Sequence, residues 1–129
     1  MTKYKARLVA RGFEHIYGKN FDETYSPVTR LPSLRLLLAL SMQFNLDLQQ
    51  MDVKTAFLNT KLAEEVYIDL PQGVQIENPY NCLKLNRALY GLKQSSRAWY
   101  EDIQKSLQSR NFKCMQNKNC LFFKHVYIR

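Results

Sequence analysis

The spacing of apolar residues predicts a first helix over residues 34–44. Leucines recur there on a wide face, and Pro32 and Ser33 come just before them. A proline near the start and a serine able to cap the free backbone N–H groups are typical of a helix N-terminus. Because the apolar face is wide, we expect this helix to be largely buried.

A second pattern predicts a long amphipathic helix over residues 95–112. Its apolar stripe repeats at four-residue spacing through Trp99, Ile103 and Leu107, with polar residues on the other faces. Trp99 belongs to this stripe, so it is a candidate core anchor more than a platform for stacking a base.

Alternating or β-branched stretches predict strands over residues 4–9, 46–53, 66–70, 82–85 and 120–128. The polar and aromatic residues 13–27 predict an ordered loop, and residues 78–81 predict a turn. There is no internal repeat and no Pro/Gly/Ser linker. The sequence therefore predicts a single domain over residues 1–129 that contains both helices and strands.

Composition adds a basic surface to this picture. Hydrophobic residues make up 46% and charged residues 23% of the 129 residues, which argues against a disordered chain. Nineteen Lys and Arg against eleven Asp and Glu give a formal charge of +8, concentrated near the two ends. Such a charge favours a polyanionic partner such as nucleic acid, although a merely soluble basic surface has the same composition.

The cysteines exclude two kinds of small protein. Three cysteines without a C-x-x-C pair indicate neither a disulfide framework nor a zinc ribbon, so we expect reduced thiols. Cys114, Cys120, His125 and His15 could form a metal site on paper, but their spacing fits no common zinc pattern. No apolar stretch is long enough to cross a membrane and no signal peptide is present, so we expect a cytosolic or nuclear protein.

The candidate for chemistry is Asp52, at the end of the predicted strand 46–53 and before an aromatic-bearing turn. Mg²⁺ usually takes one or two carboxylates together with substrate phosphates, so Asp52 supplies about half a site. Alternatively, Asp52 caps the turn that follows it.

Four ordered blocks resemble the reverse transcriptase of copia-type retrotransposons. The blocks are KARLVARGF (residues 5–13), DETYSPV (22–28), QMDVKTAFLN (50–59, similar to polymerase motif A) and LYGLKQ with RAWY (89–94 and 97–100, similar to motif B). The resemblance implies an α+β fold of fingers and partial palm, with helices packed on an incomplete antiparallel sheet. One departure is Ser95-Ser96, where the family usually has Ala-Pro.

The resemblance also implies roles around Asp52. Asp52 would be the first catalytic aspartate and would bind Mg²⁺ with the backbone carbonyl of Val53. Phe57 would be a steric gate that excludes a ribose 2′-hydroxyl, although it is equally suited to be a core aromatic.

The remaining implied roles concern nucleotide and template. Lys5, Arg7 and Arg11 would lie on the fingers hairpin and neutralise the triphosphate. The alternatives for each are a contact with template phosphate or plain exposure to solvent. Tyr90 and Gly91 would form the floor of the nucleotide pocket, with Gly91 permitting close approach of the backbone. Lys93 and Arg97 would contact the template.

The implied activity is Mg²⁺-dependent DNA synthesis on an RNA or DNA template-primer from deoxynucleoside triphosphates. The family's motif C, Tyr-x-Asp-Asp, is absent, and the chain has no adjacent pair of aspartates. Because two-metal catalysis needs further carboxylates, we expect a fragment that ends before this motif, is inactive alone and is marginally stable. The alternatives are a non-catalytic nucleic-acid-binding module and a degenerate transposon remnant. The sequence leaves the oligomeric state open.

Overall fold

The computed structural model describes residues 4–76 and 81–126 and has the predicted α+β composition. In these residues two α-helices and two 3₁₀-helices combine with short strands. The α-helices are α1 (Leu31–Gln43) and α2 (Ser95–Gln108), the 3₁₀-helices are η1 (Gly12–Glu14) and η2 (Ala56–Asn59), and the strands are β1 (Tyr67–Asp69), β2 (Cys82–Lys84), β3 (Lys113–Met115) and β4 (Lys118–Phe123).

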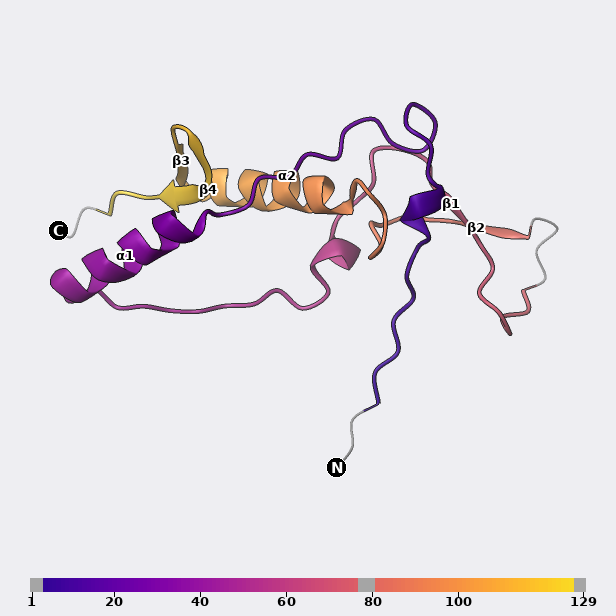
Figure 1. Ribbon diagram of the computed structural model, residues 1–129, viewed down its shortest axis with the longest axis horizontal. Helices are drawn as coiled ribbons and strands as arrows, with labels where there is room; N and C mark the ends of the chain where they lie inside the picture. The colour runs from indigo at the N-terminus through magenta and orange to yellow at the C-terminus, as the bar shows by residue number, and fades with distance from the viewer. Residues whose placement is uncertain (1–3, 77–80, 127–129) are drawn as a thin grey trace.

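The strands form two separate antiparallel sheets of two strands each. In the first sheet Ile68 of β1 pairs with Leu83 of β2. In the second, Cys114 of β3 pairs with Phe122 of β4, and the register shifts directly after Cys114. Figure 1 shows the two sheets at opposite ends of the molecule with α2 running between them. The antiparallel pairing agrees with the prediction, but the strands are not joined into one sheet.

A small hydrophobic core lies beside β1 and β2. Four residues from three segments of the chain are buried together, and three more apolar residues pack against them. The buried residues are Ala10, Val66, Leu89 and Leu92, and the packed ones are Leu62, Ile68 and Leu85. With so few buried side chains, hydrophobic burial contributes little here by the usual relation of about 25 cal/mol per Å².

Two backbone segments cross in close contact beside this core, residues 10–12 and residues 90–91. The Ala10 N–H donates to the Tyr90 carbonyl at 2.8 Å. A Cβ on Gly12 would lie 1.9 Å from the Gly91 oxygen, and a Cβ on Gly91 would lie 2.1 Å from the Ala10 oxygen. Gly91 also has φ +97°, where residues with a side chain are strained. The two segments can therefore cross only because both positions are glycine.

Helix α1 differs from its prediction in two ways. It begins at Leu31, with Arg30 at the N-cap and no side-chain capping bond, so Ser33 is not the cap. It was also expected to be buried, yet among its residues only Ser41 is buried, and Leu36 and Met42 are 60% and 81% exposed. In the described residues no sheet covers its apolar face. None of the described helices is both long and apolar enough to cross a membrane.

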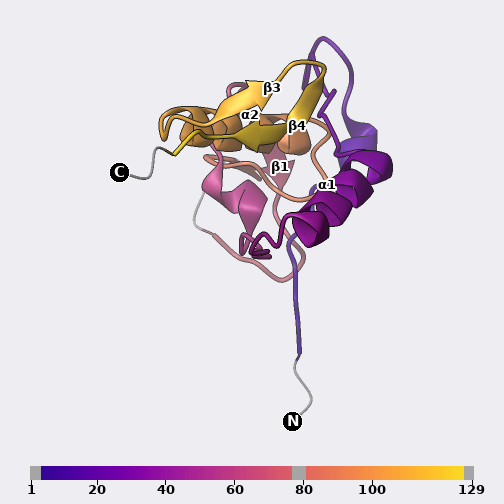
Figure 2. The same ribbon diagram turned by 90° about the vertical axis from the view of Figure 1, so that its left-hand side faces the viewer.

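Two predicted strands are not formed in the described residues. Residues 4–9 and 46–53 take part in no β-ladder, and Figures 1 and 2 show the N-terminal end of residues 4–9 projecting from the rest of the molecule. Alternating sequence favours an extended backbone, but a strand also needs a hydrogen-bonding neighbour. Consequently Leu46, Leu48 and Met51 are all more than half exposed.

The other predicted elements are close to those observed. Strands β1 and β2 lie within residues 66–70 and 82–85, α2 begins at Ser95 as predicted, and residues 13–27 are mainly loop. The predicted strand 120–128 starts earlier, at Lys118, and ends at Phe123. Strand β3 was missed, because only three residues pair there before a turn at Asn117, whose φ is +59°. Most of the predicted turn 78–81 and residues 127–128 lie outside the described residues.

The glycine crossing yields a prediction about stability. Gly12→Ala should destabilise the fold by about 1–3 kcal/mol through overpacking, and Gly91→Ala by about 2–5 kcal/mol because the left-handed backbone adds its own cost. Gly73→Ala is the matched control, because Gly73 has φ +83° but nothing within 4 Å of the added Cβ. Urea unfolding measures all three. Equal losses for Gly73 and Gly91 would contradict the crossing.

Candidate nucleotide-binding site

A groove of about 570 Å³ brings together three segments that are far apart in the sequence. One is the basic N-terminal segment, the second is the turn that follows Asp52, and the third precedes α2. The lining residues are Ala6, Arg7 and Leu8 from the first, Thr55, Ala56, Phe57 and Leu58 from the second, and Leu89 and Tyr90 from the third. The groove thus joins three of the blocks that the sequence singled out.

Two aromatic rings lie next to each other in this groove. The ring centroids of Phe57 and Tyr90 are 5.8 Å apart with an interplanar angle of 31°. Phe57 is half-buried and Tyr90 is 58% exposed, so Tyr90 retains free surface. Apolar ring faces with Arg7 in the same groove suit a ligand that combines a flat or ring-shaped part with negative charge.

Asp52 lies on the extended segment that leads to this groove. It is exposed, and among the described residues it has no hydrogen-bond or ion-pair partner. The side-chain bonds of the following turn come from Thr55 and Asn59, so Asp52 does not cap that turn. Its carboxylate is available to a ligand.

The donor set for a metal is incomplete in the described residues. They contain no group of three or more His, Cys, Asp or Glu side chains that could hold a metal ion. Cys114, Cys120, His125 and His15, all of them described, likewise form no such group. Asp52, with the Val53 carbonyl, fits one carboxylate ligand of a Mg²⁺ ion but does not by itself form a two-metal centre.

The three N-terminal basic residues are placed differently. Arg7 lines the groove, whereas Lys5 and Arg11 are not among the lining residues. Arg11 instead forms an ion pair with Glu14, with 3.5 Å between Nη1 and Oε1. Arg7 is therefore the basic residue best placed to meet a ligand in the groove.

Comparison with known proteins decides the family. Residues 1–127 match the family described as reverse transcriptase (RNA-dependent DNA polymerase). The chain belongs to this reverse transcriptase family. It is 41% identical over 125 residues to the retrovirus-related Pol polyprotein from transposon TNT 1-94 of Nicotiana tabacum, covering 96% of this chain and 9% of that protein.

Other relatives of this reverse transcriptase segment are also Pol polyproteins of copia-type elements. The chain is 39% identical over 113 residues to the Pol polyprotein from transposon RE1 of Arabidopsis thaliana, covering 87% of this chain and 8% of the relative. It is 34% identical over 110 residues to the transposon Ty1-ER2 Gag-Pol polyprotein of Saccharomyces cerevisiae, covering 81% and 6%. The chain thus spans less than a tenth of the length of these relatives. No solved structure matches it.

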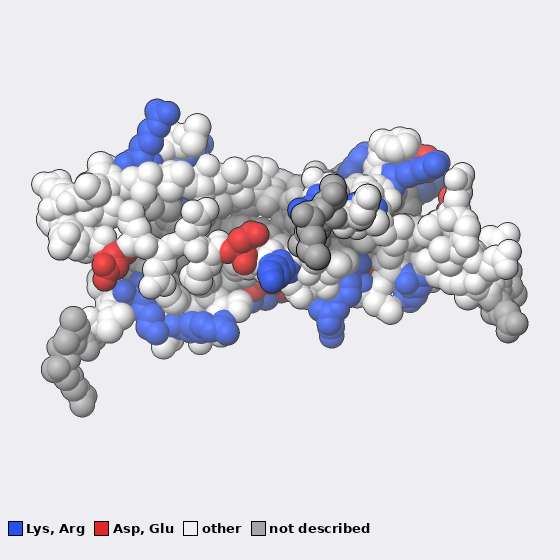
Figure 3. Space-filling model, turned by 90° about the horizontal axis from the view of Figure 1, so that it is seen from below, with Lys and Arg blue, Asp and Glu red and all other residues white. Residues whose placement is uncertain are grey.

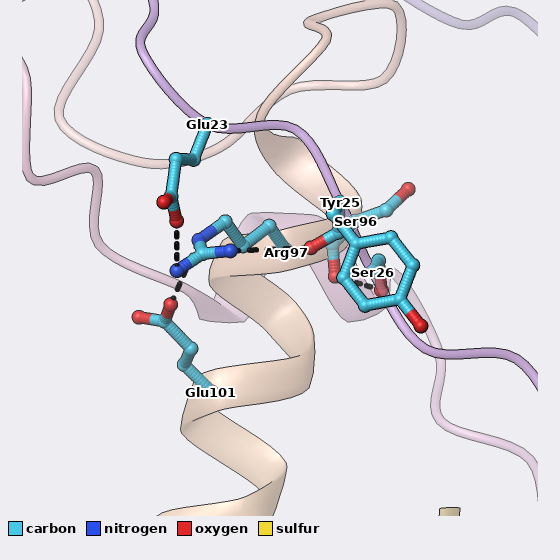
Figure 4. A network of polar contacts seen from close by, with 6 residues as sticks. All are labelled: Glu23, Tyr25, Ser26, Ser96, Arg97 and Glu101. Atoms are coloured by element: carbon cyan, nitrogen blue, oxygen red, sulfur yellow. Dashed lines mark hydrogen bonds and ion pairs between the residues drawn. The ribbon is translucent and has the colours of Figure 1, made fainter. Parts of the chain in front are cut away.

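In this reverse transcriptase segment Arg97 is bound within the protein (Figure 4). Its guanidinium forms ion pairs with Glu23 and, at 3.0 Å, with Glu101, and it donates to the Tyr25 carbonyl at 3.4 Å. Ser26 adds a hydrogen bond to the Ser96 carbonyl at 3.1 Å. The Glu101 contact has the i,i+4 spacing that a sequence can reveal, whereas the Glu23 contact cannot be seen in the sequence.

Lys93 is likewise engaged with a distant loop. Its Nζ donates to the His15 carbonyl at 3.2 Å and lies 4.7 Å from the centre of the Phe21 ring. Nearby, Gln94 donates to the Asn20 carbonyl at 3.0 Å. The start of α2 therefore holds the loop of residues 15–26, and neither Lys93 nor Arg97 lines the groove.

Basic side chains remain widespread on the surface of the reverse transcriptase segment. Figure 3 shows Lys and Arg along the length of the face seen from below, where acidic side chains are fewer. Trp99 is half-buried and lies outside the buried cluster. The surface is therefore basic without a single dominant patch on this face.

The groups with a shifted pKa lie in or beside the two sheets, and none of them lines the groove. Hydrogen bonds from Lys84 and Tyr67 lower the pKa of Glu65, and its bond with Glu65 raises the pKa of Lys84. Burial raises the pKa of Tyr100, whose hydroxyl donates to the Asn119 carbonyl at 2.9 Å. The first pair links β2 to the segment before β1, and the Tyr100 bond links α2 to β4.

We expect the Arg97 network to stabilise the fold modestly. Arg97→Met should lower the free energy of unfolding by about 1 kcal/mol and expose the loop around Glu23 to proteolysis, because partly exposed ion pairs contribute only about 0–1 kcal/mol each. Arg110→Met is the control, since Arg110 bonds only to Ser106 in its own turn. Urea unfolding and limited proteolysis compare them. If both variants behaved alike, the network would not hold the loop.

Proposed function

We propose that these residues bind the incoming deoxynucleoside triphosphate in an RNA-directed DNA polymerase of a copia-type retrotransposon. The observation that carries the proposal is the groove itself. It combines Arg7, Phe57 and Tyr90 from three blocks of a reverse transcriptase family member. The natural partners would be an RNA or DNA template-primer and the nucleotides, inside the cell.

Three of the lining residues and some of their neighbours suit different parts of a nucleotide. Arg7 would neutralise triphosphate oxygens, because its fixed fork of donors matches phosphate geometry, with Lys5 and Arg11 as secondary charges. Phe57 would pack under the sugar and exclude a 2′-hydroxyl. Tyr90 would form the floor of the pocket. Gly91 does not line the groove and is in close contact with the Ala10 backbone, so it would support the floor by holding Tyr90 against the N-terminal segment.

Asp52 and the Val53 carbonyl would hold Mg²⁺ beside the groove. When bound, Mg²⁺ supplies positive charge that stabilises the transferring phosphate. The 129 residues contain no Tyr-x-Asp-Asp and no adjacent aspartates, so further carboxylates must come from elsewhere. These residues alone therefore bind a nucleotide but do not polymerise.

Lys93 and Arg97 are weaker candidates for template contact. Arg97 directs three of its nitrogens at protein partners. Because an arginine has five donors and a lysine three, each keeps spare capacity for a template phosphate. In this proposal they position the loop of residues 15–26 first and contact the template second.

The net charge of +8 favours one alternative, a basic module that binds nucleic acid without catalysis. Such binding depends on counterion release, so RNA affinity would fall steeply with salt. It would not depend on Phe57, and it would not distinguish deoxy- from ribonucleotides.

Nucleotide binding gives the first test. Arg7→Gln should weaken binding of Mg·dATP about tenfold, the loss of roughly 1.4 kcal/mol expected for a charge-assisted contact. Phe57→Val should reduce the preference for dATP over ATP and leave overall affinity less affected. Fluorescence anisotropy with labelled nucleotides measures both, and Arg110→Gln is the control for lost charge. Unchanged affinity in Arg7→Gln would contradict the assigned role.

Primer extension tests whether these residues alone are sufficient for catalysis. The 129 residues should show no Mg²⁺-dependent DNA synthesis on an RNA template, because Asp52 alone supplies too few ligands to hold two metal ions in place. An Asp52→Ala variant and an active reverse transcriptase serve as controls. Synthesis by the isolated chain that disappears in Asp52→Ala would show that these residues are sufficient for catalysis and would overturn the claim.

A further inference from the structure

The turn between Asp52 and Phe57 contains a strained residue. Thr55 has φ 51° and ψ 45°, the left-handed conformation. Threonine is β-branched, and such residues are genuine outliers in this region because the side chain crowds the backbone. The chain therefore holds Thr55 against its own preference, at the point where the extended Asp52 segment enters η2.

Asn59 clasps this turn beside the Thr55 hydroxyl, which donates to the Lys54 carbonyl at 2.7 Å. The Asn59 Nδ2 donates to the Lys54 carbonyl at 3.3 Å and to the Thr55 carbonyl at 3.4 Å. Two backbone bonds close the same turn, from the Leu58 N–H to the Thr55 carbonyl at 2.9 Å and from the Thr60 N–H to the Phe57 carbonyl at 3.0 Å. The amide group thus bonds to both peptide units that flank the left-handed residue.

The clasp is in turn fixed to the segment that leads to Tyr90. Arg87 Nη1 donates to the Asn59 carbonyl at 2.6 Å, and the Ala88 N–H donates to the Thr60 carbonyl at 2.9 Å. Thr60 is only 1% exposed, so this end of η2 is well anchored. One end of the turn is therefore held by buried structure, whereas the Asp52 end is exposed.

We propose that Asn59 is a positioning residue that fixes the Asp52 carboxylate relative to the Phe57 ring. The turn lies between Asp52 and Phe57. Its shape therefore sets the position of the Asp52 carboxylate when the Phe57 ring packs against a sugar. Asn59 itself does not line the groove. This role rests on the proposed nucleotide site. It means that Asn59, a side chain outside that site, influences the selection between deoxyribose and ribose.

Hydrogen exchange tests the clasp without any nucleotide. Asn59→Asp keeps the shape but replaces the donor with a carboxylate that repels the Lys54 and Thr55 carbonyls. It should speed exchange of the Leu58 and Thr60 amides by about tenfold, as for a local opening. Adding Thr55→Gly should restore much of the protection, because glycine accepts the left-handed conformation. Asn86→Asp is the charge control, since Asn86 is exposed and makes none of these bonds.

The ratio of dATP to ATP affinity tests the positioning. Asn59→Asp should lower this ratio several-fold while Arg110→Gln leaves it unchanged, and Thr55→Gly should restore it in the double variant. Unchanged exchange at Leu58 and Thr60 would overturn the clasp. Faster exchange with an unchanged ratio would overturn its link to sugar selection. If the parent chain bound no nucleotide, the proposed function would fail and the selectivity claim with it, while exchange would still decide the clasp.

Discussion

The contact on which the site depends is the crossing of the N-terminal segment over the segment before α2. Two glycines let the backbones touch, and one hydrogen bond between Ala10 and Tyr90 fixes their register. Arg7 precedes this crossing by a few residues and Tyr90 lies in it, so the crossing brings charge and ring to the same groove. Without it, the groove would lose one wall.

A site assembled this way is built from loops and turns on a small core. The groove residues lie on a terminal segment, a 3₁₀ turn and a loop, and the buried cluster beneath them is limited to a few side chains. Side-chain hydrogen bonds and ion pairs add to this small core. Asn59 and Arg87 hold the turn after Asp52, and Lys93 and Arg97 hold the loop of residues 15–26. Much of the precision of the site therefore depends on hydrogen bonds, each worth only about 1 kcal/mol.

How much the sequence could predict depended on the range of the interactions. Helix α2 follows from its own periodicity, and β1 and β2 from short β-favouring runs bounded by turn residues. Residues 46–53 alternate just as well but form no strand, because a strand requires a neighbour that the sequence pattern does not specify. The same limit applies to the site. Resemblance indicated Lys5, Arg7 and Arg11 together, and only the fold separates Arg7 from the others. The loop partners of Lys93 and Arg97, which are His15, Glu23 and Tyr25, lie more than 70 residues away and could not be predicted, unlike the i,i+4 contact with Glu101.

The central claim is that three separate segments form one nucleotide site, and amide chemical-shift mapping tests it most directly. Titration of the chain with dATP and Mg²⁺ should move the signals of Arg7, Phe57 and Tyr90 together along a single saturating curve, with the signals of β3 and β4 unmoved. Shifts that saturate at different concentrations in the three segments, or that appear mainly in the β3–β4 hairpin, would contradict a shared site.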